Sequence, residues 1–128
     1  MKIHELLSRY AAGQRNFSGI NLMAARLRNV DLRQINFSSA DLTSANLSYA
    51  YLNGADFRNA NLQNVNLSSA NLTQANFTGA NLVGANLTNA NLTEANLTQV
   101  DLRKVNLSQA YMRRVIVSEG VESNHPVS

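Results

Sequence analysis

The chain has 128 residues, a length that suits one domain, and 45% of them are hydrophobic, enough to build a core. Aromatic residues make up only 6% and tryptophan is absent, which argues against a core of large rings. Cysteine is also absent, which excludes disulfide bonds and thiolate metal sites, and the net charge of +3 is mildly basic. No apolar run approaches the roughly 20 residues that span a bilayer, and the N-terminus lacks an apolar signal segment, so we expect no membrane association and a cytoplasmic location.

The first predicted element is an amphipathic helix within residues 1–14. Apolar side chains recur there at the i, i+3, i+4, i+7 and i+8 spacing of one helical face, at Ile3, Leu6, Leu7, Tyr10 and Ala11. Gly13 is a typical helix stop, because glycine readily adopts the left-handed conformation that ends many helices. We expect the apolar stripe to cap the end of the structure that follows.

From residue 15 to residue 117 the sequence repeats every five residues. Each position whose number ends in 2 or 7, from Phe17 to Val117, is Leu, Phe, Met or Val, and from Ile20 onward the residue two before it is Ala, Val or Ile. Asn or Asp usually comes directly before this central residue, and two mostly polar residues follow it. A period of five gathers apolar residues neither on one face of an α-helix nor on one face of a flat strand. The chain must therefore bend at each polar pair and wind into a coil with its apolar side chains inside.

The phenylalanines set the size of the coil. Phe17, Phe37, Phe57 and Phe77 are spaced 20 residues apart. With four units in each coil they would stack on one side of a square solenoid of about five coils. Arg15 falls at an inward position, so we expect the first unit to be incomplete.

Units such as Ala80-Asn81-Leu82-Val83-Gly84 resemble the A(D/N)LXX pattern of the pentapeptide-repeat protein family. The resemblance covers residues 16–117, and the segment from Leu6 to Phe17 is also similar to the leader of small cyanobacterial members. It implies an all-β fold, a right-handed quadrilateral β-helix (a β-solenoid), here with a short N-terminal α-helical cap. We accordingly divide the chain into a cap helix at 1–14, a β-helix at 15–117 and a C-terminal tail at 118–128.

The C-terminal end of the repeat departs from the pattern. Ile116 replaces the usual Asn, which would turn an apolar side chain outward, and the tail from Ser118 to Ser128 is polar. A solenoid needs covered ends, because a bare terminal coil offers core and open strand edges to other chains. Either the tail folds over the last coil or a second copy of the chain packs there as a homodimer, and the sequence leaves both open.

Candidate catalytic and metal-binding groups fail on their spacing. The carboxylates at the repeat position before the centre are Asp31, Asp41, Asp56 and Asp101. Even the two that share a side of the rod would be three coils, about 14 Å, apart, beyond the about 5–10 Å of an acid–base pair. His4 and His125 have no neighbours at metal-ligand spacing. We therefore predict no catalytic residue, no metal, no cofactor and no enzymatic activity.

Tyrosine and arginine residues are the better candidates for a functional site. Tyr51 and Tyr111 take the Asn position on one side of the predicted rod, and Tyr49 takes the corner that leads into that side. Arg33 and Arg113 lie at its two ends. Both residue types are enriched among interface anchors. We therefore expect these five residues to contact a protein partner whose rim is acidic.

The favoured function is a non-catalytic protein-interaction module or small regulator, and the sequence leaves the partner unidentified. The family resemblance implies an alternative, because some members inhibit DNA gyrase by mimicking DNA, but mimicry needs a strongly negative surface. Weak direct binding of a polyanion by the basic residues near the two ends is a further alternative. Basic and aromatic residues do not interleave as they do in stacking sites for nucleic acids, so we predict no strong nucleic-acid binding.

Overall fold

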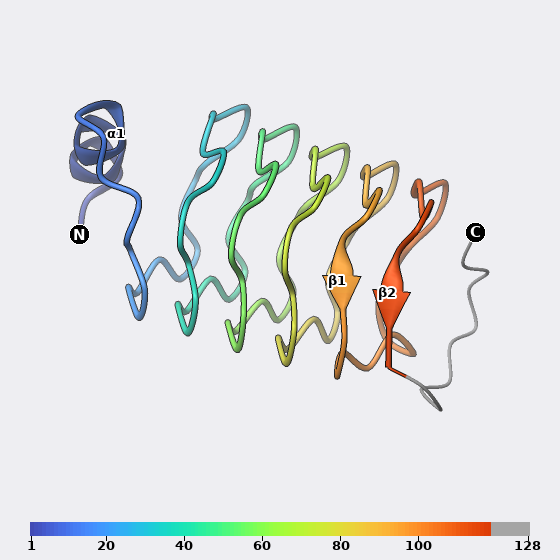
Figure 1. Ribbon diagram of the computed structural model, residues 1–128. Helices are drawn as coiled ribbons and strands as arrows, with labels where there is room; N and C mark the ends of the chain where they lie inside the picture. Colours follow the sequence, from blue (N-terminus) through green and yellow to red (C-terminus); the bar gives the residue numbers. More distant parts are fainter. Residues whose placement is uncertain (119–128) are drawn as a thin grey trace.

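The computed structural model describes residues 1–118 and forms a rod of stacked coils that begins with one helix (Figure 1). It is the predicted right-handed quadrilateral β-helix. Residues 20 apart pair as parallel β-bridges along the rod, for example Asn46 with Asn66 and Asn66 with Asn86, which confirms four five-residue units in each coil. Two extended segments are long enough to be strands, β1 (Asn96–Leu97) and β2 (Ile116–Val117), and they pair in parallel.

The core consists of the central residue of each unit and the apolar residue two before it. From Phe37 to Leu102 every one of these side chains is at most 5% exposed. Three of the four phenylalanines of the predicted column stack, since the ring centroids of Phe37 and Phe57 lie 6.0 Å apart and those of Phe57 and Phe77 lie 5.0 Å apart. Leucine and alanine both point inward because they are two residues apart, and residues two apart in an extended segment point to the same side.

A tight turn forms each corner of the coil. The carbonyl of the central residue accepts a hydrogen bond from the N–H three residues later, as from Ala75 to Leu72 at 2.9 Å. The residue before that donor has a positive φ, +61° at Gln74, which is the mark of a type II turn. β-Branched side chains are poorly tolerated there. Accordingly no Val, Ile or Thr occupies such a position, whereas Thr is common one residue earlier, as at Thr73 and Thr93.

The helix α1 (Ile3–Ala11) covers the N-terminal end of the coils, as predicted. Leu6 is fully buried, and Gly13 donates to the carbonyl of Tyr10 in the bond pattern that often closes helices. One detail differs from expectation, since Ala11, the last residue of α1, is exposed and does not join the buried stripe. Arg15 is exposed with its guanidinium over the Tyr10 ring, 3.7 Å from the centroid, in agreement with the expected incomplete first unit.

The last coil is less regular than those before it. Asn81 and Asp101 form no bridge, and the Gly84 N–H bonds to the carbonyl of Lys104, one residue beyond the partner that the ladder predicts. At the end of the rod β2 leaves Ile116 52% exposed, in accord with the outward position expected for it. Apart from Ser118, the predicted tail at 118–128 lies outside the described residues.

Candidate interaction surface

A side-chain-to-backbone hydrogen bond supports each side of the rod. At the position before the central residue, the Asn or Asp Oδ1 accepts a bond from the N–H two residues later, as Asn61 does from Gln63 at 3.1 Å. Among the described residues every Asn and Asp at this position makes the bond. This explains why the repeat prefers these residues, whose short side chains reach their own backbone.

Four positions depart from this rule, at Arg26, Tyr51, Tyr111 and Ile116. None of these side chains can place an acceptor on the N–H two residues later, so each departure gives up a bond that contributes about 1 kcal/mol. Local rules of a fold are most often broken where a residue serves function. Tyr51 and Tyr111 are 53% and 65% exposed, so the lost bond is not repaid by burial of their rings.

Tyr51 and Tyr111 lie on one ladder of the rod. β-Bridges connect Asp31 to Tyr51, Tyr51 to Asn71, Asn71 to Asn91 and Asn91 to Tyr111, which places the two rings on the same side as the register predicts. We call this side, formed by residues 31–33, 51–53, 71–73, 91–93 and 111–113, the tyrosine face. The structure thus places Tyr51 and Tyr111 on the same side of the rod. Their part in binding stays a prediction.

Tyr49 occupies the corner that leads into the tyrosine face. Its φ of +60° lies in the left-handed region, which costs a non-glycine residue about 1–2 kcal/mol. The side chain is 51% exposed, and the guanidinium of Arg28 lies over its ring, 5.0 Å from the centroid. The other corners have the same positive φ, as at Ser44 and Asn64, so Tyr49 differs from them in its large exposed ring and not in its backbone.

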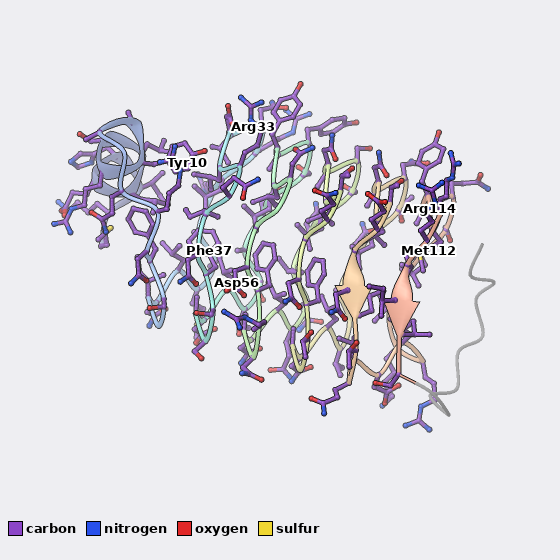
Figure 2. The ribbon with its side chains drawn as sticks, in the orientation of Figure 1. Tyr10, Arg33, Phe37, Asp56, Met112 and Arg114 are labelled. Atoms are coloured by element: carbon purple, nitrogen blue, oxygen red, sulfur yellow. The ribbon has the colours of Figure 1, made fainter. Side chains whose placement is uncertain are left out.

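The two arginines predicted for this face differ in their surroundings. Arg33 pairs with Asp31 through two hydrogen bonds of 2.9 and 2.7 Å, and these hold the pKa of the Asp31 carboxyl below its ordinary value. The backbone carbonyl of Arg33 also accepts a 2.6 Å hydrogen bond from the Tyr10 hydroxyl (Figure 2). Arg113 is exposed and, within residues 1–118, its side chain has no ion-pair partner. Arg33 thus offers a partner much less free charge than Arg113.

Pairing of Asp with the Arg two residues later recurs along the rod and has a simple sequence signal. Asp56 pairs with Arg58 and Asp101 with Arg103 at 2.7 and 2.8 Å, in the triplets Asp-Phe-Arg and Asp-Leu-Arg. Both side chains leave the same strand side, since they are two residues apart. Sequence reasoning treated these residues as separate charges and missed the pairs, and it placed Arg26 and Arg28 among the basic residues near the N-terminal end and not with the tyrosines.

Acid–base or metal chemistry finds little support in the arrangement of charges. Of the carboxylates in the described part of the chain, Glu5, Asp31, Asp56, Glu94 and Asp101 each lie within 4.0 Å of an arginine nitrogen. No three His, Asp or Glu residues within residues 1–118 are placed to hold a metal ion. No helix of this region is long and apolar enough to cross a membrane.

Comparison with known proteins gives matches of two kinds. The family model for pentapeptide repeats matches residues 20–59, 40–79 and 80–118 with eight copies, and no curated protein sequence matches. A trypsin-treated variant of QnrB1, a plasmid-mediated fluoroquinolone resistance protein, has a similar fold, with a TM-score of 0.54 and 19% identity over 81% of this chain. The match covers 61% of that QnrB1 chain, so this chain spans less than two thirds of its length.

Two cyanobacterial pentapeptide-repeat proteins are similar over nearly the whole chain. The protein alr5209 from Nostoc PCC 7120 is 33% identical, over 91% of this chain and 96% of its own, with a TM-score of 0.35. Rfr23 from Cyanothece 51142 is 26% identical, over 95% and 99%, with a TM-score of 0.34. The similarity to these two proteins lies in the repeated sequence, since their TM-scores carry no argument about detailed shape.

Proposed function

Because this chain belongs to the pentapeptide-repeat family, we propose that it is a non-catalytic protein-interaction module or small regulator that binds its partner through the tyrosine face. The observation that carries the proposal is that Tyr51 and Tyr111 replace the bond-forming Asn on one ladder and keep their rings exposed. Exposed tyrosines on a rigid scaffold supply contact area at little entropic cost. A cytoplasmic location is part of the same proposal.

The size of the face sets the expected strength of the contact. It is one short strand wide and about five coils tall, so it falls below the roughly 800 Å² per partner of a standard interface. We therefore propose a contact of modest affinity with a partner whose rim is acidic, because the Arg113 side chain at one end has no ion-pair partner within residues 1–118. The exposed Ile116 of β2 offers a second contact, through which a homodimer could form at the C-terminal end.

DNA mimicry is disfavoured by the charges on the surface. A DNA-like surface needs many unpaired carboxylates. Among the described carboxylates all but Asp41 lie beside an arginine, so the negative charge is locally neutralised. The fold shared with QnrB1 does not by itself transfer a function, since one fold serves many functions.

A capture experiment tests the tyrosine face. The double variant Tyr49→Ser/Tyr51→Ser, immobilised beside the unaltered protein, should capture the partner from extract of the native cell much more weakly. Its melting temperature should change by no more than a few degrees, because both rings are exposed. Met23→Ser/Val83→Ser is the matched control, since it removes two exposed apolar side chains from another side of the rod. Equal capture by the tyrosine variant would rule out this face as the site.

A further inference from the structure

Arg26 and Arg28 differ from the other arginines of the early coils. Arg33 and Arg58 each pair with the Asp two residues before them. Arg28 instead follows Arg26, so neither has an acceptor at that distance, and within residues 1–118 neither forms an ion pair. Both are exposed. Two uncompensated positive charges thus stand next to each other on one strand side.

These two arginines lie beside the corner that Tyr49 occupies. Arg26 pairs through its backbone with Asn46, and the guanidinium of Arg28 lies over the Tyr49 ring. Ser48, between these elements, is 4% exposed, whereas Ser68 on the next coil of the same column is half-buried. Ser48 is thus covered more fully than its counterpart on the next coil, next to the corner that carries Tyr49.

We propose that Arg26, Arg28, Tyr49 and Tyr51, which we call the arginine–tyrosine corner, bind an acidic peptide segment of the protein partner. The inference rests on the proposed function and names the chemistry of the partner at one place on it. Carboxylates of the segment pair with the two guanidinium groups, and its apolar atoms pack on the tyrosine rings. The unrelieved charge, the exposed rings and two departures from the Asn/Asp rule, at Arg26 and Tyr51, coincide at this corner.

The corner suits a short peptide better than a nucleic acid. It spans the first two coils and offers two cations, whereas strong binding of a nucleic-acid backbone needs many phosphate contacts. The tyrosine ring under Arg28 is already occupied on one face, so it cannot act as an open stacking platform for bases on that face. The expected contact is weak and sensitive to salt, because exposed ion pairs are screened.

Binding of hexaglutamate, a capped six-residue peptide, tests the corner on the full chain. In amide-resolved NMR titrations at low salt, the shifts should concentrate at residues 26–31 and 46–51. Arg26→Gln/Arg28→Gln should raise the Kd by roughly three- to tenfold. Lys2→Gln/Lys104→Gln removes the same charge from exposed positions elsewhere and should leave the Kd within about twofold. Melting curves of both variants establish that they are folded.

Three results of these titrations overturn the inference. The first is an equal loss of affinity in both charge variants, which indicates attraction by net charge alone. The second is an unchanged Kd in Arg26→Gln/Arg28→Gln. The third is a 12-base-pair DNA duplex that shifts the same amides at lower concentration than hexaglutamate, which makes nucleic acid the occupant. Capture of the native partner separates the two proposals. If Tyr49→Ser/Tyr51→Ser abolishes capture and Arg26→Gln/Arg28→Gln does not, the acidic-peptide proposal is wrong and the proposed tyrosine face still stands.

Discussion

The middle coils, residues 40–99, and the last coil, residues 100–117, use the same five-residue unit but are held together differently. In the middle coils the inward residue before the centre is Ala except at Val65, and the turn bonds measure 2.8–3.1 Å. In the last coil Val100, Val105 and Val115 take this place, and the turn bonds donated by the latter two lengthen to 3.3 Å. The turn bonds donated by Val65 and Val100 are 3.1 Å, within the range of the alanines, so the two long bonds reflect the end position of the coil as well as the larger inward residue.

The difference between the last coil and the middle coils is largest at residues 101–104, which form one side of the last coil. Valine flanks it at both ends, at Val100 and Val105, and within the described residues no bond joins the Leu82 N–H to the Asp101 carbonyl. Large flanking residues do not by themselves interrupt a ladder. The side at residues 31–34 lies between Val30 and Ile35, and its Leu32 N–H still donates to the Tyr51 carbonyl at 2.9 Å. The interruption at residues 101–104 therefore combines large inward residues with a place at the end of the rod.

The largest expected difference is between Leu67→Ala and Leu107→Ala, which lie in one column. Leu67 is fully buried with coils on both sides, and its truncation should cost about 3–5 kcal/mol in urea unfolding. Leu107, 5% exposed in the last coil, should cost about 2 kcal/mol because the site can relax. Gln63→Ala at the surface should cost less than about 0.5 kcal/mol. Equal costs for the two leucines would show that the ends are as tightly packed as the middle.

Two substitutions on the tyrosine face should change the free energy of unfolding in opposite directions. Asn71→Ala removes the acceptor for the Thr73 N–H and hydroxyl, and should destabilise the protein by about 1–2 kcal/mol. Tyr51→Asn restores the missing acceptor and should stabilise it by about 0.5–1 kcal/mol while weakening partner capture. Urea unfolding measures both changes in stability, and the m-values should stay the same as in the unaltered protein. A destabilised Tyr51→Asn would mean that the ring contributes more to the fold than to binding.

Hydrogen exchange sharpens the contrast at the interrupted ladder. The Leu62 N–H donates to the Asn81 carbonyl at 2.8 Å, whereas Leu82 lacks the equivalent bond, so the Leu82 amide should exchange at least about tenfold faster. Val100→Ala/Val105→Ala should reduce the difference in exchange rate between the two amides, because the smaller side chains let residues 101–104 approach residues 81–84. If both amides are equally protected in the unaltered protein, the ladder is continuous in solution.

Acid should weaken the fold slightly through the Asp–Arg pairs. Burial alone would raise the pKa of Asp56, but hydrogen bonds from Arg58 outweigh it and hold the pKa below the ordinary 3.8. Below about pH 4 the unfolded chain therefore takes up a proton that the folded chain does not, so stability falls as pH drops toward the folded pKa. Asp56→Asn keeps the backbone acceptor and should flatten this decline between pH 4 and 2. An identical decline in both proteins would assign it to other groups.

The period of five, the 20-residue coil and the cap helix were all predictable from the sequence, because each rests on the burial of apolar residues at fixed spacing. The register also placed Tyr51 and Tyr111 on one ladder correctly. The sequence did not reveal that Arg33 is neutralised by Asp31, since that depends on side-chain direction two residues apart on one strand. The stacking of Arg15 on Tyr10 was missed for a related reason, because the cap helix supplies a ring only after it has docked.

The 20-residue coil also constrains how this gene can change in length. Loss or gain of one five-residue unit between Tyr51 and Tyr111 would keep the core pattern, yet it would turn everything beyond it by a quarter of a revolution. Only insertions or deletions of whole coils keep the two tyrosines in line. The number of five-residue units before a surface residue therefore sets the side of the rod on which it lies. Gain or loss of one unit would move a binding residue to a new side while the apolar core pattern stays the same.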